Sequence, residues 1–292
     1  MGADGSERVI LAEPRQYAFP RLSPDGRLIA VAIGAPGRRD VWLYDLSSQT
    51  MTRLTSEGST NDRPEWSADS KRVLYRSDRT TRSGIWIRPA DLSASSTPLL
   101  AGERLDVFEA VMSPDMRDAV YQLDTIGADI YYRDLSGDTT PHAVSNNVKA
   151  LETMPRLSPD GHWVSFTTDE SGHDEIVVQP FPGPGGRVQV SASGGSEAVW
   201  SRDGRRLFYR GDGHLMAAHV TTAPTFVVTA RDTLFLDAYQ GAPNPHSNYD
   251  VMPDGTHFLF LKAASEGNMI VVVNWRSVMR ARMAASAPKY FP

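Results

Sequence analysis

A four-residue phrase recurs six times along this chain of 292 residues and limits what the chain can fold into. In its fullest form it reads Ser-Pro-Asp-Gly, and the six copies begin at Ser23, Ser67, Ser113, Ser158, Ser201 and Met252. The aspartates at the third position lie 43 to 51 residues apart. Pro presets the backbone, Asp bonds the following amides and Gly accepts positive φ, so the phrase predicts a chain reversal. A repeat at this period indicates stacked supersecondary units.

Each copy of the phrase stands in the same order of apolar segments. An approach strand ends in an apolar residue directly before the turn, and a second, third and weaker fourth strand follow, as in 28–33, 41–44 and 52–55. Four short antiparallel strands at this period are typical of a propeller blade. The sequence therefore predicts an all-β, six-bladed β-propeller that forms a single domain over 1–292. The expected blades are approximately 20–62, 63–107, 108–152, 153–196, 197–246 and 247–275 with strand 8–12.

The two ends of the chain supply a test of this prediction. The sixth unit lacks a convincing fourth strand, whereas an extra apolar strand precedes the first unit. Ile10 lies 13 residues before Ser23, and Leu54 lies 13 residues before Ser67. The N-terminal strand thus has the position of a fourth strand, and we expect it to complete the last blade and hide two sheet edges. A short helix is expected at 275–283, within a C-terminal tail that includes 276–292.

Composition excludes several classes of function. The formal net charge is -5 without a long basic block, so nucleic-acid binding is not expected. The longest strongly apolar run, 269–273, is far too short to cross a bilayer, so no membrane insertion is expected. The absence of cysteine excludes disulfides and thiolate chemistry. The first residues show no export signal, so either the protein is cytoplasmic or an export segment lies outside this sequence.

The repeats resemble a known family. Ser-Pro-Asp-Gly followed by Asp40–Leu46 and by Arg53-Leu54-Thr55 resembles the WD-like Pro-Asp repeats of the six-bladed, periplasmic TolB propellers. The stretch from Thr168 through Gly183 is similar to the C-terminal propeller of certain bacterial serine/threonine kinases. The resemblance covers about 8–275 and implies a bacterial, periplasmic or otherwise extracytoplasmic binding scaffold, expected to be a monomer. The helical N-terminal domain of TolB has no counterpart here, so no TolB partner is carried over.

Motifs of catalysis are missing or incomplete. The phrase that begins at Tyr132 is similar to a kinase catalytic loop but lacks its histidine and its metal-binding asparagine. The glycine-rich stretch 183–186 lacks the Lys of a phosphate loop, and neither Gly-x-Ser-x-Gly nor His-Glu-x-x-His occurs. The sequence therefore predicts a protein that is not an enzyme and has no cofactor.

Charged residues on the approach strands are the candidate binding residues. Charges are rarely buried unless they are paired, so on the innermost strands of a ring we expect them to meet water in the central channel or at its mouth. Either they form a salt-bridged channel without a ligand, or they bind an unknown protein, peptide or small ligand on the axis. These residues are Arg21, Arg63, Glu65, Glu109, Arg156, Glu197 and Asp250. The recurrent aromatic residues, Trp66 and Trp200 among them, are assigned to contacts between blades.

Three residues are weak candidates for metal binding. His246 lies in the one sizeable insertion, and Asp169 and Asp174 belong to an acidic segment that lacks calcium-loop spacing. An ordinary loop histidine and a solvated hairpin tip are the favoured interpretations of these residues. Two alternatives to a binding protein therefore stay open. One is a metal-dependent lyase or hydrolase that uses channel histidines and carboxylates, and the other is the gating propeller of a prolyl-oligopeptidase-like peptidase.

Overall fold

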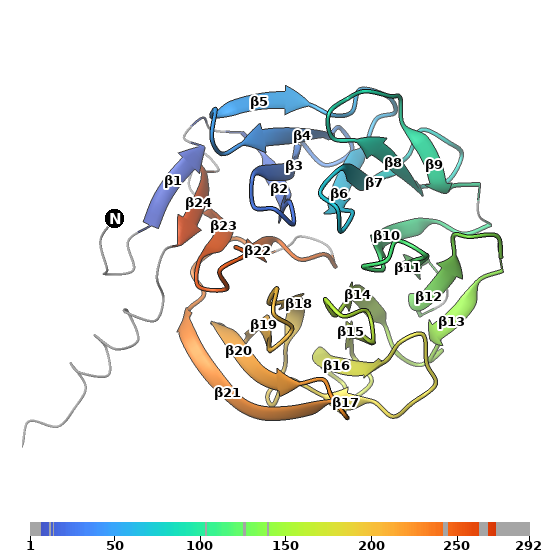
Figure 1. The fold of residues 1–292 in the computed structure, drawn as a ribbon, viewed down its shortest axis with the longest axis vertical. Coiled ribbons are helices and arrows are strands. Elements are labelled where there is room, and N and C mark those ends of the chain that lie inside the picture. The colour runs from blue at the N-terminus through green and yellow to red at the C-terminus, as the bar shows by residue number, and fades with distance from the viewer. Residues whose placement is uncertain are drawn as a thin grey trace, which may run out of the picture.

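The chain forms a ring of antiparallel sheets around a central axis (Figure 1). The computed structural model describes residues 7–272 except positions 12, 14, 103, 125–126, 139, 242–244 and 263–267. Within these residues 24 strands pair into six four-stranded sheets, one for each repeat. The architecture is therefore an all-β propeller. The helix expected at 275–283 lies outside the described residues. No helix capable of spanning a bilayer occurs in the described part of the chain.

In blades 1 to 5 the strands run from the axis outward in chain order (Figure 1). The strands of blades 1 to 3 are β2 (Tyr17–Leu22), β3 (Leu28–Ile33), β4 (Asp40–Asp45) and β5 (Thr50–Arg53); β6 (Asn61–Trp66), β7 (Arg72–Ser77), β8 (Gly84–Pro89) and β9 (Thr97–Leu100); β10 (Val107–Met112), β11 (Asp118–Leu123), β12 (Asp129–Asp134) and β13 (His142–Ser145).

Blades 4 and 5 repeat this order, and blade 6 draws on both ends of the described chain. Their strands are β14 (Glu152–Leu157), β15 (Trp163–Thr168), β16 (Glu175–Pro180) and β17 (Val188–Gln189); β18 (Ser196–Trp200), β19 (Arg206–Gly211), β20 (His214–Thr221) and β21 (Val227–Leu236); β22 (Tyr249–Val251), β23 (Phe258–Lys262), β24 (Asn268–Val272) and β1 (Glu7–Leu11). In blades 1 to 5 the innermost strand begins one to three residues before the expected boundary.

The ring closes through its first strand. β1 pairs antiparallel with β24, with Arg8 opposite Val271 and Val9 opposite Ile270. The predicted sharing of one sheet by the two ends of the chain is confirmed, and Figure 1 shows β1 and β24 side by side. Closure of this kind ties the last blade to the first and protects the ring from opening at one seam.

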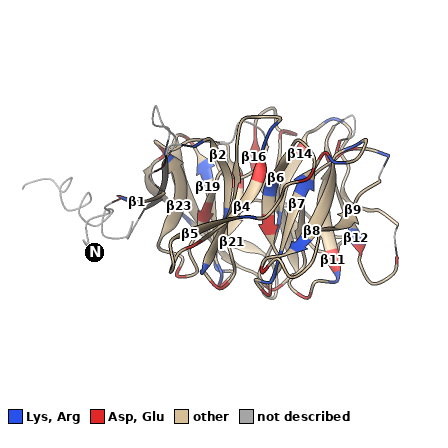
Figure 2. Cartoon of the chain, turned by 90° about the horizontal axis from the view of Figure 1, so that it is seen from above, with Lys and Arg blue, Asp and Glu red and all other residues tan. Residues whose placement is uncertain are grey.

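The hydrophobic core lies between neighbouring blades. One cluster joins blade 1 to blade 6 and contains Tyr17, Ile29 and Leu259, all of them buried. Comparable clusters fill the other boundaries, because side chains on alternate positions of a strand face the two adjacent sheets. Figure 2 shows the strands running between the two faces of the ring, with acidic and basic residues interspersed on both faces.

The repeated turns share one hydrogen-bonding scheme. In the first copy the Ser23 hydroxyl donates to Asp25 Oδ1 (2.6 Å), and this carboxylate also accepts the Arg27 amide (3.1 Å). Ser70 and Met116 replace the usual Gly, yet both adopt φ of 61°. Their amides bond to Ser67 O (3.0 Å) and Ser113 O (2.8 Å), as Gly26 bonds to Ser23 O (2.8 Å). These turns are therefore as tight as the others, at the cost of a left-handed backbone in a residue with a Cβ.

The innermost strands carry β-bulges at a shared position. Pairing with the second strand is interrupted between Ala18 and Arg21, and corresponding breaks occur in β6, β14 and β18. One residue in each break has a left-handed backbone, with φ of 50° to 58°: Phe19, Arg63, Met154 and Glu197. Bulges redirect side chains and often lie next to functional sites. They occur here beside the axis, where the candidate site lies.

Candidate functional site: an axial funnel and its stopper

A cavity of about 380 Å³ lies on the axis of the ring. We call it the funnel. All six blades line it, and its mouth is on the face that carries the Ser-Pro-Asp-Gly turns, because second residues of five turns form the rim: Pro24, Ala68, Pro114, Pro159 and Arg202. Its wall includes the six apolar residues that directly precede the turns: Leu22, Trp66, Met112, Leu157, Trp200 and Val251. Every blade thus contributes an apolar residue to the wall, beside which Ser158 and Ser201 also line the cavity.

Two tryptophans hold the wall in place as well as lining it. Trp66 Nε1 donates to the Arg21 carbonyl (3.1 Å), and Trp200 Nε1 donates to Ser165 Oγ (3.1 Å). Each bond reaches the preceding blade, so the predicted role in contacts between blades is confirmed for both. Their position in the cavity was not predicted. Trp200 is buried and Trp66 is half-buried, so Trp66 is the better placed of the two to contact a ligand.

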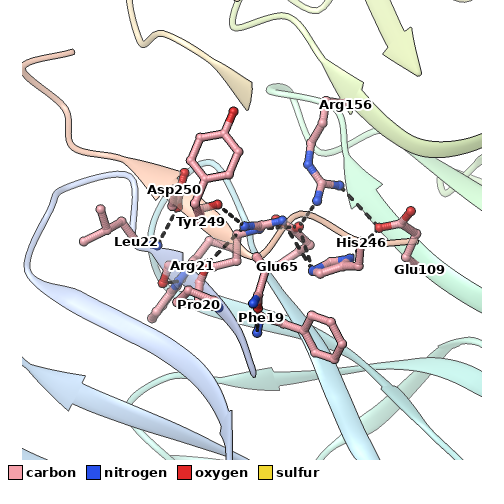
Figure 3. Close-up of polar contacts among 12 residues, drawn as sticks. Phe19, Pro20, Arg21, Leu22, Glu65, Glu109, Arg156, His246, Tyr249 and Asp250 are labelled. Atoms are coloured by element: carbon pink, nitrogen blue, oxygen red, sulfur yellow. Dashed lines mark hydrogen bonds and ion pairs between the residues drawn. The ribbon is translucent and has the colours of Figure 1, made fainter. Parts of the chain in front are cut away.

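The floor of the funnel is a set of paired charges (Figure 3). Glu65 Oε1 lies 2.7 Å from Arg21 Nε and 2.8 Å from an Arg156 nitrogen, so one carboxylate stands between two guanidinium groups. Asp250 accepts the amides of Leu22 (2.7 Å) and Val251 (2.8 Å). The floor therefore carries two positive and two negative groups that neutralise one another.

Below the floor, the channel is closed by His246 (Figure 3). The imidazole Nδ1 lies 2.6 Å from Glu109 Oε2, and Nε2 lies 3.3 Å from an Arg21 nitrogen. The ring packs edge-on against Phe19, with 4.9 Å between centroids. His246 precedes β22 of blade 6 and Glu109 lies on β10 of blade 3, on the opposite side of the ring. A contact between these residues has to cross the axis, so the funnel is closed at this end and does not continue through the ring.

Asn248, two residues after His246, is anchored beside it by hydrogen bonds. Asn248 Oδ1 accepts the Phe19 amide (2.8 Å), and the Asn248 amide donates to Glu197 Oε2 (2.6 Å). His246, Ser247 and Asn248 are all fully buried. We call these three residues the stopper. The chain itself thus supplies partners to channel groups that a ligand could otherwise contact.

Burial dominates the electrostatics of the stopper. It raises the pKa of Glu109, against the opposing effect of the nearby Arg156. It lowers the pKa of His246 well below its ordinary value, and the positive charges of Arg21 and Arg156 lower that pKa further. Burial, with Arg76 as the next cause, lowers the pKa of Arg63 to about 10. His246 is therefore neutral at physiological pH.

The seven charges predicted to line the channel do lie on the innermost strands, at two depths. Arg21, Glu65, Arg156 and Asp250 border the funnel. The other three lie at the level of the stopper, where Arg63 donates to the Phe108 carbonyl (3.0 Å) and Glu197 pairs with Arg210 (3.3 Å). The expectation that these charges meet water is wrong for six of them, which are at most 9% exposed, whereas Asp250 is half-buried at the funnel. The six buried groups have partners on other strands instead.

The weak metal candidates do not come together around a common point. Asp169 lies in the turn between β15 and β16, where its Oδ1 accepts the Leu151 amide (2.7 Å), whereas His246 lies on the axis. Burial, together with the neighbouring Asp169, raises the pKa of Asp174. Among the described residues no group of three His, Asp or Glu is placed to hold a metal ion.

The wall, and the closing of the channel by the stopper, are the parts of the site that sequence reasoning missed, although His246 was named as a weak metal candidate. Both had a signal. An apolar residue precedes the turn in every repeat, which fixes one wall position for each blade. The last two aspartates are 51 residues apart, against 43 to 46 for the others, and this longer interval contains the stopper.

Comparison with known proteins supports the architecture. The chain matches no family model. The Tol-Pal system protein TolB of Helicobacter pylori strain J99 is 24% identical to it over 181 residues, which are 59% of this chain and 43% of that protein. The chain thus spans less than half the length of this relative.

Solved structures with similar folds include two TolB proteins. The putative TolB of Agrobacterium tumefaciens superposes with a TM-score of 0.66 at 18% identity, over 91% of this chain and 93% of that one. TolB of Acinetobacter baumannii gives a TM-score of 0.65 at 17% identity, over 90% and 62%. An oligogalacturonate lyase of Vibrio parahaemolyticus gives 0.59 at 12% identity, over 92% and 93%. At these identities the likeness shows a TolB-like β-propeller fold and leaves function to the site.

Proposed function

We propose that this chain is a non-catalytic binding propeller that accepts part of a partner protein, a peptide or a small ligand in the funnel. The observation that carries the proposal is the apolar wall, with one residue from every blade around about 380 Å³. Ligand sites are typically concave and mostly apolar, with a few polar groups that fix orientation. The funnel has both features.

The charges of the floor suit a supporting role. Arg21, Glu65 and Arg156 already satisfy one another, so a ligand gains more from apolar contact with the wall than from a new ion pair. Apolar contact is worth about 25 cal/mol for each Å² removed from water. A floor without net charge also disfavours ligands with a charged tip, because the tip would lose water without finding a free counter-charge.

The resemblance to TolB supports further parts of the proposal. The protein is proposed to act as a monomer in the bacterial envelope, outside the cytoplasm, on a protein partner and without nucleic acid or membrane insertion. The similarity to kinase propellers stays a prediction. The lyase and peptidase alternatives gain no supporting contact from the site, since guanidinium groups already hold the Glu65 carboxylate.

A peptide-display experiment tests the proposal. Random peptides selected on the wild-type protein are tested against Ala68→Trp, which places an indole at the exposed rim of the funnel. The matched control is Val148→Trp, because Val148 is 75% exposed and lies in the loop before β14, on the opposite face. We expect selected peptides to lose binding to A68W and to keep it for V148W. Failure to select any peptide, or peptides that ignore A68W, would contradict the proposal.

A further inference from the structure

We propose that the stopper is a proton-controlled gate: in acid His246 takes up a proton, separates from Glu109 and Arg21, and the stopper leaves the axis. The funnel then opens toward the opposite face of the ring. This inference stands apart from the proposed function, because it concerns the chain alone and needs no ligand for its test.

The contacts of the imidazole require its neutral form. Glu109 Oε2 accepts from Nδ1–H at 2.6 Å, so Nε2 is left without a proton and accepts from Arg21 at 3.3 Å. Protonation puts a second N–H on the ring, directed at a guanidinium that can only donate. The contact with Arg21 then changes from a hydrogen bond into a repulsion between two cations.

The surroundings of His246 offer little compensation for a positive charge. Four guanidinium groups and two carboxylates face it, from five innermost or second strands: Arg21 of β2, Arg63 and Glu65 of β6, Arg76 of β7, Glu109 of β10 and Arg156 of β14. Burial and the guanidinium charges both lower the pKa of His246. Acid also weakens the second partner, because burial raises the pKa of Glu109 and favours its neutral form. Both proton uptakes therefore act against the same contact.

The closed stopper is also incompletely satisfied. Ser247 Oγ and Glu109 Oε1 are buried without a hydrogen-bond partner among the described residues. Buried polar groups without partners are costly, and contact with water removes that cost. The stopper is thus held by the contacts of His246 and by four hydrogen bonds of Asn248, two of which join its side-chain amide to the Gln240 and Gly241 carbonyls. Loss of the His246 contacts leaves a segment that gains hydration when it moves out.

Amide hydrogen exchange tests the gate at residue level. The amides of Phe19 and Asn248 are both bonded at the stopper, whereas the Gly161 and Gly204 amides bond within turns. After correction for intrinsic exchange rates, we expect the protection of Phe19 and Asn248 to fall at least tenfold between pH 7.5 and pH 4.5. The turn amides of Gly161 and Gly204 should retain their protection. Unchanged protection of Phe19 and Asn248 would overturn the proposal.

Two histidine variants assign the proton. His246→Asn cannot be charged, so exchange at the two stopper amides should depend on pH much less than in the wild type, with only Glu109 left to take up a proton. His219→Asn is the matched control, because His219 pairs with Asp232 (2.8 Å) at the surface, and it should behave as the wild type. If H246N keeps the wild-type dependence on pH, the gate is not controlled by His246.

A measurement on the wild-type protein covers the case in which H246N does not fold. The ring ¹³C–¹H signal of His246 should keep the position of neutral imidazole down to the pH at which the stopper amides lose protection. A ring that becomes charged while Phe19 and Asn248 remain protected would contradict the gate.

Discussion

The two ends of the axis differ in chemistry although the same innermost strands form both. At the turn face the strands end in apolar residues that leave an open funnel. At the level of the stopper they present charged side chains, and the chain itself fills the space between them. The wall is regular because each of its residues lies directly before a repeated turn. The closed end is irregular because it depends on one segment, inserted between the last two turns. A repeat architecture can thus place a binding surface at one end and a closure at the other.

The largest expected effect is on the paired charges that separate the two ends. Arg21→Met removes one of the two guanidinium partners of Glu65 and the contact with His246 Nε2, and leaves Arg156 alone to compensate the buried carboxylate. Breaking a buried pair of this kind costs about 3–5 kcal/mol. Urea denaturation should show this loss for R21M. Arg15→Met is the control, because the Arg15–Glu13 pair is exposed and such pairs are worth about 0–1 kcal/mol. Equal losses in the two variants would mean that the floor is not a coupled unit.

A wall variant should affect the open end without disturbing the closed one. Trp66→Ala removes a half-buried indole and its bond to the Arg21 carbonyl. Because full burial of such a side chain corresponds to about 3–5 kcal/mol, a half-buried one should cost about 2–3 kcal/mol. Selected peptides should lose binding, while the Asn248 amide keeps its protection. Loss of that protection in W66A would show that the wall and the stopper are not independent.

The turns of the mouth allow a smaller, two-sided comparison. Met116→Gly relieves a left-handed backbone, and the gain is about 0.5–1 kcal/mol after the greater chain entropy of Gly is subtracted. Gly26→Ala is the opposite change at φ of 73°, where a Cβ would also lie 3.0 Å from Pro253 Cγ, and it should cost about 1–2 kcal/mol. Thermal denaturation of both variants measures whether each substitution raises or lowers the stability of the fold. Two changes of the same sign would contradict a shared turn geometry.

The smallest expected effect is on the stability of the fold at low pH, through the surface carboxylate of Asp45. Bonds from Ser47 and then Ser48 lower the pKa of Asp45 to about 2. A carboxylate with a lowered folded-state pKa stabilises the fold above its unfolded pKa, and the contribution disappears as the pH falls from 3.8 toward 2. Asp45→Asn should therefore reduce the slope of stability against pH in this window and leave the slope between pH 6 and 8 unchanged. An unaltered acid slope would show that these bonds add nothing.

Much of the fold could be predicted because its determinants are local. The turn phrases and the β-branched runs place the strands, and the equal spacing of Ile10 and Leu54 from the next turn predicted the closure that β1 and β24 confirm. A second repeated feature was overlooked. Asp40 and Glu175 begin third strands, and each accepts a hydroxyl, from Thr55 and Ser191, at the start of the next boundary between blades.

The pairing of the channel charges could not be predicted in the same way. Arg21 and Glu65 lie 44 residues apart, and His246 and Glu109 lie 137 residues apart. Which charges meet depends on how far each bulge turns its side chain toward the axis, and spacing along the chain does not encode that rotation. Charges without a visible partner in the sequence were therefore expected to be exposed to solvent. In the structure, partners that are distant in the sequence allow them to be buried.

The most direct test of a funnel closed by a stopper is the reactivity of single cysteines. The chain has no cysteine, so one thiol can be placed at the half-buried Met112 in the funnel wall and, in a second variant, at Ser247 in the stopper. The account predicts that a small methanethiosulfonate reagent modifies M112C readily at pH 7.5 and leaves S247C protected. Equal rates at the two positions would show that the axis is open from end to end, and would contradict the account.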